Sequence, residues 1–150
     1  MVRRAVACVL LTADARVVLH RRGPACHDEV GMIEPLGGEV DAGESLLDAL
    51  HREVTEEAGD LLLRVVRPLT PQRLTVPDTR GVLHRWLVHP FLALLLGGEP
   101  SVREPEYNAG FVFVPMADVL SQPLTKLCGG LLTESARSSL AEIRGEAACL

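Results

Sequence analysis

Three glutamates near the middle of the chain have the residue type and spacing of a cation site. Glu53, Glu56 and Glu57 occupy positions i, i+3 and i+4, so on a helix they project to one side. Gly59 follows them, which is typical of a helix C-terminus. Carboxylates there face the negative end of the helix dipole and repel one another by roughly 1 kcal/mol per pair in water. The cluster favours a hard divalent cation, Mg²⁺ or Mn²⁺; the alternative is a solvated acidic helix face.

The residues around this cluster form a longer pattern. Gly38 is followed after five residues by Glu44, and after seven more by the run Arg52–Gly59. This spacing resembles the Nudix box, the signature of a family that hydrolyses nucleoside diphosphates linked to another group. One position departs, because Asp60 stands where the family has an aliphatic residue. The run Leu61–Leu63 follows at once, so we expect the departure to concern local packing and not chemistry.

The resemblance implies a role for each charged residue of the pattern. It assigns metal binding to the helix glutamates and to one backbone carbonyl of the glycine loop: Glu53, Glu56, Glu57 and Gly38. It also implies an orienting ion pair between Glu44 and Arg52. A bound metal removes the phosphate charge that repels an incoming water, and it can make a bound water more acidic. In this scheme Glu56 binds a second ion or accepts a proton from the water.

Residues just before the pattern are candidates for substrate contacts. Arg21 and Arg22 end a predicted strand near the glycines and are suited to hold a distal phosphate; the alternative is a pair of surface arginines. Glu34 is placed to meet a ribose or the edge of a base. Gly37 would let the backbone approach a phosphate closely, although it also suits a simple turn.

A later loop supplies further candidates. The family often uses one more glutamate as a ligand or general base, and we prefer Glu106 over Glu104 because it lies nearer the next strand. Tyr107 in the same loop, or Trp86, is a platform on which a base can stack, although Trp86 also suits the core. The scattered histidines are assigned no catalytic role: His20, His27, His51, His84 and His89.

Composition narrows the class of protein. The 150 residues suit one domain, and 47% apolar residues are enough for a core. A net charge of −5 argues against nucleic acid polymers and anionic membranes as partners, whereas a metal can attract phosphorylated small molecules locally. The cysteines lack metal-ligand spacing, so we expect free thiols in a reducing cytoplasm: Cys8, Cys26, Cys128 and Cys149.

Hydrophobic patterns predict the elements that must position these residues. Strands are predicted over 5–11, 17–21, 32–36, 61–69, 82–96 and 111–114, and helices over 44–58 and 131–146. In the first helix the buried face is predicted to contain Leu47, Leu50, Val54 and Ala58. Residues 68–81 and 97–110 are predicted loops, Pro90 can interrupt its strand, and Pro115 starts a helical turn.

The N-terminus allows two interpretations. Arg3 and Arg4 followed by an apolar run over 5–11 imitate a signal peptide, but the run is at the short limit for one. We favour a hairpin, because cleavage would remove a central strand. Strands interleaved with two main helices predict an α/β fold with a mixed sheet between helical layers. The Nudix resemblance implies the same α/β/α sandwich, as a single domain over residues 1–150.

The sequence therefore predicts a Mg²⁺-dependent hydrolase, with Mn²⁺ as a substitute, that cleaves the pyrophosphate linkage of a nucleoside diphosphate derivative. The candidates are a (deoxy)nucleoside triphosphate, oxidised ones included, and ADP-ribose-like compounds. One alternative is a non-catalytic nucleotide-sensing module on the same fold, although the charged positions of the box are intact. Another is a prenyl diphosphate isomerase, for which Cys26 is a weak counterpart of the catalytic cysteine. A homodimer is compatible with the fold.

Overall fold

The structure, a computed structural model, describes residues 1–132. These residues form one eight-stranded mixed sheet with two α-helices and a 3₁₀ helix. In chain order the elements are β1 (Val2–Leu11), β2 (Arg16–Arg22), β3 (Ile33–Glu34), β4 (Leu36–Glu39), α1 (Leu46–Ala58), β5 (Leu62–Pro68), β6 (Gln72–Pro77), β7 (Leu83–Gly97), β8 (Asn108–Pro115), η1 (Met116–Ser121) and α2 (Lys126–Leu131).

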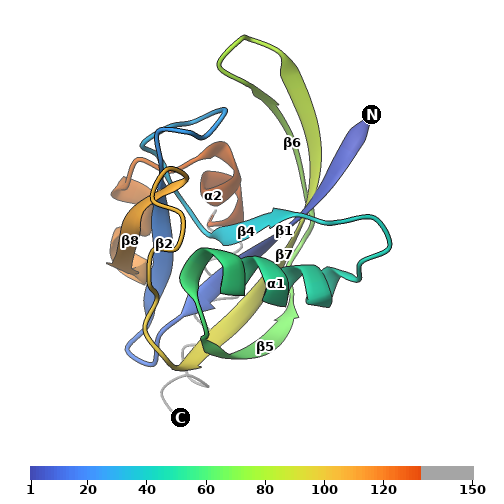
Figure 1. The fold of residues 1–150 in the computed structure, drawn as a ribbon. Coiled ribbons are helices and arrows are strands. Elements are labelled where there is room, and N and C mark those ends of the chain that lie inside the picture. The colour runs from blue at the N-terminus through green and yellow to red at the C-terminus, as the bar shows by residue number, and fades with distance from the viewer. Residues whose placement is uncertain (133–150) are drawn as a thin grey trace.

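Strand β1 runs through the middle of the sheet (Figure 1). It pairs in parallel with β7 along its whole length, and on its other side it pairs antiparallel with β4 and then with β2. Its residues from Ala5 to Leu11 are all buried, as expected for a strand covered on both faces. The predicted hairpin is present, and Ala15 takes the left-handed conformation in its turn.

The sheet separates two cores. On one face α1 packs through Ala49, Leu50, Val54 and Ala58. On the other face η1 and α2 contribute the apolar residues, Val119 and Cys128 among them. Figure 1 shows α1 in front of β1, whereas α2 lies farther from the viewer than β4. The predicted mixed sheet between helical layers is confirmed.

Helix α1 differs from its prediction at the start. Ser45 caps it by accepting a hydrogen bond from the Asp48 N–H, so the helix begins two residues after Glu44. Leu47 was predicted to be buried but is 47% exposed. Leu46 packs against the core instead, because it lies three and four residues before Ala49 and Leu50 and shares their face.

Strand β6 lies within residues 68–81, which were predicted as a loop. It pairs with the first half of β7, while β5 pairs with the second half. Pro90 falls opposite the junction of β5 and β6, where its carbonyl accepts the Leu69 N–H. A backbone N–H at this position would point to the same side as the carbonyl, between β5 and β6, where no strand pairs with it. The proline therefore costs no hydrogen bond of the sheet, and β7 continues through it.

Smaller differences concern element ends. The predicted strand over 32–36 is divided into β3 and β4 at Pro35, and β8 begins inside the predicted loop 97–110. Asp60 is exposed while Leu61 packs partly buried against the α1 core, as expected. The helix predicted over 131–146 lies outside the described residues except at its start. No helix within residues 1–132 is long and apolar enough to cross a membrane.

The packing of α1 yields a paired test. We expect Leu50→Ala to lower the free energy of unfolding by about 2–5 kcal/mol, because it leaves a cavity between α1 and the sheet. Leu47→Ala should change it by no more than about 0.5 kcal/mol, since that side chain faces solvent. Urea denaturation of both variants measures the difference, and equal losses would contradict the helix register described above.

Candidate active site

The glycines of β4 bring backbone unusually close to α1. Gly37 pairs with Ala7 of β1, and a Cβ on Gly37 would overlap the backbone carbonyl of Val6. A Cβ on Gly38 would overlap the carboxylate of Glu53. Only glycine therefore lets the β4 backbone lie against both the central strand and the last turns of α1.

Glu57 is a largely buried carboxylate near the end of α1. Its side chain is 16% exposed, its Oε1 accepts the Gly37 N–H at 2.8 Å, and its Oε2 lies 3.2 Å from Nε2 of His20. Burial raises the pKa of Glu57 well above its usual range. Among residues 1–132 no lysine or arginine forms an ion pair with it, so its charge is oriented but not neutralised.

Arg52 contacts three other carboxylates, Glu44 before the helix and Glu53 and Glu56 within it. It donates to both oxygens of Glu44 at 2.8 and 2.9 Å, so the expected ion pair is present. It also donates to Glu53 at 2.9 Å, to Glu56 at 3.2 Å and to the carbonyl of Glu39 at 2.9 Å. Hydrogen bonds from Arg52 lower the pKa of Glu44 to about 2. Burial raises the pKa of Glu53 even though Arg52 contacts it.

A cavity of roughly 560 Å³, here called the main cavity, opens over these carboxylates. Seven acidic side chains line it against three arginines. The acidic residues are Asp28, Glu34, Glu39, Glu53, Glu57, Asp78 and Glu104, and the arginines are Arg3, Arg22 and Arg80. A cavity of this charge repels a phosphate anion unless cations bind with it.

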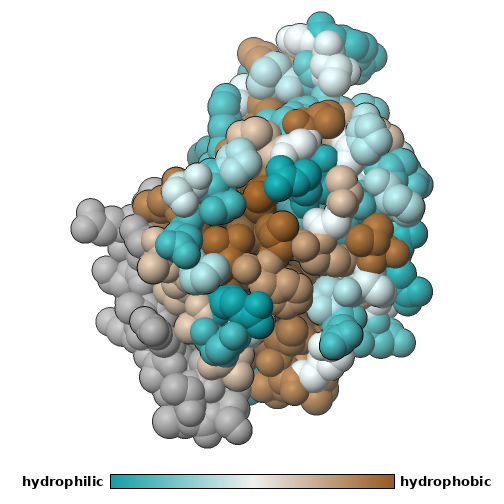
Figure 2. Space-filling model, turned by 90° about the vertical axis from the view of Figure 1, so that its left-hand side faces the viewer, coloured by the Kyte–Doolittle hydropathy of each residue, from teal (hydrophilic) through white to brown (hydrophobic). Residues whose placement is uncertain are grey.

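The upper wall of the main cavity is the projecting β6–β7 hairpin (Figure 1). At its tip Asp78 accepts hydrogen bonds from Arg80 and lies 3.2 Å from Nε2 of His84. The Thr79 N–H donates to the carbonyl of His27, which ties the tip to the loop after β2. The tip is largely hydrophilic on the side seen in Figure 2. The cavity lining includes Asp78 and Arg80 from the hairpin and His27 from the loop.

A second, smaller cavity of roughly 170 Å³, here called the apolar slot, adjoins the main cavity. Trp86 and Glu34 line both. Trp86 is partly buried against the core and lies under the guanidinium of Arg3, 4.4 Å from the ring centre. The remaining slot lining is mostly aliphatic, from β1, β6, β7 and α2: Ala5, Val6, Ala7, Leu74, Val76, Val88 and Leu127.

The structure brings most predicted substrate residues to the main cavity. Glu34, Gly37 and Tyr107 line it, as does Arg22. The guanidinium of Arg22 is paired with Asp28 and, at 2.6 Å, with Glu34. Burial raises the pKa of Glu34 to about 6.

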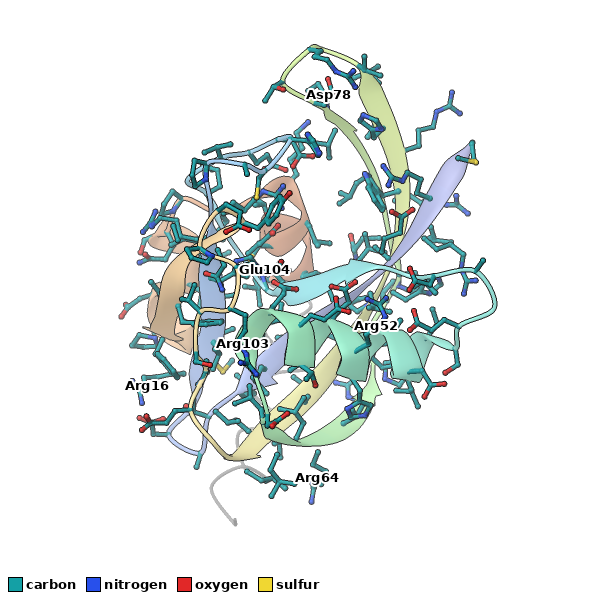
Figure 3. All side chains as sticks on the ribbon, viewed as in Figure 1. Arg16, Arg52, Arg64, Asp78, Arg103 and Glu104 are labelled. Carbon is teal, nitrogen blue, oxygen red and sulfur yellow. The ribbon has the colours of Figure 1, made fainter. Side chains whose placement is uncertain are left out.

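Other predicted residues lie outside the cavity lining. Arg21 donates to the Gly31 carbonyl instead, since alternate residues of β2 face opposite ways. Glu56 has a side chain 53% exposed on the outer side of α1. Glu106 is not a lining residue, whereas Glu104 is. Figure 3 shows Glu104 beside β4 and the C-terminal end of α1.

Sequence reasoning missed His20, which is 4% exposed and lies within contact distance of Glu34 and Glu57. Burial lowers the pKa of His20 to about 4. The sequence could have indicated its place, because side chains two residues apart on a strand share a face. His20 lies two residues before Arg22, and both line the main cavity. Asp78 and His84 carried no local signal, since their place depends on the unpredicted strand β6.

The acidic residues of the main cavity have the oxygen donors that a divalent cation prefers. Within residues 1–132 no three Asp, Glu, His or Cys side chains already converge as a metal site. Glu53 and Glu56 instead accept hydrogen bonds from Arg52. The chemistry fits nonetheless. Two mostly buried carboxylates one turn apart, with raised pKa values, lie beside a glycine backbone in an acidic cavity.

Comparison with known proteins decides the family. A family model described as the NUDIX domain matches residues 1–130. The chain belongs to the Nudix family. The protein is accordingly a pyrophosphohydrolase that acts on nucleoside diphosphate derivatives, and Nudix hydrolases generally use divalent metal ions.

Solved Nudix structures are similar over nearly the whole chain. A MutT NUDIX hydrolase from Burkholderia pseudomallei is 28% identical, with a TM-score of 0.70 over 88% of this chain and 96% of that one. The Nudix hydrolase RenU from M. smegmatis is 22% identical, with a TM-score of 0.74 over 94% and 87%. The NUDIX domain of Shewanella oneidensis NrtR, solved with ADP ribose, is 24% identical, with a TM-score of 0.72 over 93% and 89%. The comparison with curated proteins returned no significant match.

The two Nudix glycines yield contrasting predictions. We expect Gly37→Ala to destabilise the fold by about 1–3 kcal/mol or more, because the new methyl group meets rigid backbone of β1. In Gly38→Ala the new methyl group meets only the flexible end of Glu53, so the free energy of unfolding should fall by less than about 1 kcal/mol. Because the methyl group displaces that carboxylate, turnover should fall by roughly 10–100-fold. Thermal unfolding and steady-state rates of both variants measure this. If the two variants lost stability and turnover to the same extent, the proposed difference between the two glycines would be wrong.

Proposed function

We propose that this Nudix protein is a Mg²⁺-dependent hydrolase, with Mn²⁺ as a substitute, of the pyrophosphate linkage in a small nucleotide. The observation that carries the proposal is the pair Glu53 and Glu57. Both are half-buried, face the main cavity and lie against the β4 backbone, and Glu57 has no arginine or lysine partner within residues 1–132. Buried like charges are costly unless a cation neutralises them.

The residues that would hold the cation are Glu53, Glu57 and the backbone carbonyl of Gly38. Glu56 joins them if it leaves its contact with Arg52. When bound, the cation neutralises phosphate charge and makes a coordinated water more acidic. Arg52 keeps Glu53 in place through the same guanidinium that binds Glu44, so the box acts as one connected network.

The rest of the reaction falls to residues of the main cavity. Glu104 replaces Glu106 as the candidate general base, because it lines the cavity beside the end of α1. A base there accepts the proton of the attacking water. Arg3, Arg22 and Arg80 are the cavity cations that can face phosphate oxygens, although each is paired with a carboxylate before substrate arrives.

The apolar slot is suited to the flat face of a nucleobase. Its aliphatic walls and Trp86 provide the surface, and Glu34 at its edge accepts hydrogen bonds from ring or exocyclic N–H groups. The substrate panel should contain (deoxy)nucleoside triphosphates, oxidised ones included, and ADP-ribose. ADP-ribose is included because the NrtR NUDIX domain was solved with it. Free thiols at Cys8, Cys26 and Cys128 support a reducing cytoplasm as the site of action.

The first test measures turnover across this panel with Mg²⁺ and with Mn²⁺, with products identified by mass. Glu53→Gln and Glu57→Gln should each lower turnover by more than about 100-fold, beyond the loss typical of an indirect contact. Their folds should persist, since neither change removes apolar packing. Tight nucleotide binding without turnover by the wild-type protein would contradict a hydrolase and support a sensing module.

The two loop glutamates form a matched pair. We expect Glu104→Gln to lower kcat by about 10²–10⁴-fold with little change in KM, as loss of a general base does. Glu106→Gln should retain wild-type turnover, because Glu106 does not line the cavity. If only Glu106→Gln lost activity, the assignment of the base to Glu104 would be wrong.

The raised pKa of Glu57 predicts how Mg²⁺ stabilisation depends on pH. A carboxyl whose pKa is raised in the folded state stabilises the fold below its unfolded value of about 4.3, and this stabilisation is lost as pH rises through the folded pKa. Mg²⁺ must displace that proton, so its binding strengthens as pH rises. The Mg²⁺-induced increase in Tm should therefore be larger at about pH 8 than at about pH 5.5. Glu57→Gln should abolish the difference, and an equal increase at both pH values would contradict the argument.

A further inference from the structure

His20 occupies an enclosed position in the middle of β2. It pairs with Glu34 of β3 on one side and with Phe111 of β8 on the other, just before a register shift. The residue is 4% exposed. A polar ring buried to this degree requires partners, because an unpaired buried polar atom costs free energy.

One nitrogen of the ring, Nε2, faces two carboxylates, whereas Nδ1 is buried without a hydrogen-bond partner within residues 1–132. Its Nε2 lies 3.2 Å from Oε2 of Glu57 and 3.5 Å from Oε1 of Glu34. When both carboxylates are ionised, as Glu57 is when it binds a cation, they can only accept, so the Nε2 atom that faces them carries the hydrogen. The Nε2–H group therefore lies between two carboxylates that would otherwise repel each other directly.

Each oxygen of Glu57 has an uncharged group of the protein beside it. The Gly37 N–H donates to Oε1 at 2.8 Å, and the imidazole faces Oε2. Each carboxylate oxygen has a second lone pair, which stays free for another ligand. A neutral donor orients the carboxylate without cancelling its charge, whereas an arginine there would compete with a cation.

We infer that His20 is a positioning residue that fixes the Glu57 carboxylate for binding the divalent cation. The inference rests on the proposed function, in which Glu57 is a metal ligand. His20 itself touches neither cation nor substrate in this scheme and acts through Glu57. The arrangement follows the general pattern in which ligand carboxylates are oriented by hydrogen-bond partners behind them.

The test is Mn²⁺ binding to the substrate-free full chain, followed by electron paramagnetic resonance at one fixed pH. We expect His20→Leu to weaken Mn²⁺ binding by about 10–100-fold, as the loss of such a partner does elsewhere. His20→Gln should recover most of this loss, because its terminal amide can place an N–H near the former Nε2. His20→Asn, whose side chain is shorter, should not.

Two controls separate this role from a structural one. His89→Leu removes another imidazole with a buried, unpartnered nitrogen, from β7, and should leave Mn²⁺ binding unchanged. In a Glu57→Gln background, His20→Leu should cause no further loss, because the two residues act as one unit. Thermal unfolding of every variant verifies the fold.

The outcomes are distinguishable. If His20→Leu lowers only Tm while Mn²⁺ affinity stays at the wild-type value, or if His20→Asn rescues binding as well as His20→Gln, the inference is overturned. If Glu57→Gln itself leaves Mn²⁺ affinity unchanged, the proposed function fails first and the inference falls with it. Loss of affinity in both single variants without additivity supports the role.

Discussion

The structure depends on keeping two carboxylates, Glu53 and Glu57, half-buried side by side at the negative end of a helix. Burial, the helix dipole and mutual repulsion all oppose their charged forms. The chain compensates with a small set of polar contacts: the N–H of Gly37, the ring of His20 and the guanidinium of Arg52. Much of the surrounding architecture serves to hold these groups. The unfavourable charge that remains is the reason for proposing a cation at this site.

The compensation divides the two carboxylates into different roles. Glu53 belongs to the Arg52 network, which also includes Glu44 and the carbonyl of Glu39, and so links α1 to the end of β4. Glu57 depends on neutral donors from β4 and β2. Because β4 pairs with β1, the central strand indirectly fixes the donor to Glu57. The two carboxylates are therefore supported by the sheet on one side and by an arginine on the other.

The sequence predicted the parts of the site whose spacing is local. The glutamates, the Glu44–Arg52 pair and the glycine loop all lie within one short stretch, where helix periodicity and turn chemistry determine geometry. Leu47 was misplaced because two neighbouring leucines offer competing helix faces, and packing against the sheet selects Leu46. The choice between Glu104 and Glu106 depended on the path of a long loop, for which sequence spacing carries no information.

Long-range pairing accounts for most of what was missed. Pro71 lies just before β6, and Pro77 is its last residue. The proline and threonine content of this stretch favoured a loop. Only its pairing with β7 makes it a strand and brings the hairpin tip over the cavity. His20 was overlooked because a lone histidine on an apolar strand has no motif. Its proposed role becomes apparent only in the folded chain, where Glu34 of β3 and Glu57 of α1 both lie near Nε2 of His20.

One measurement tests the central claim directly: an anomalous difference map from a crystal soaked in Mn²⁺ with a non-hydrolysable nucleotide analogue. The account predicts a peak between Glu53 and Glu57, within bonding distance of the Gly38 carbonyl. A map without a peak at this position, in a crystal whose main cavity holds the nucleotide, would contradict it.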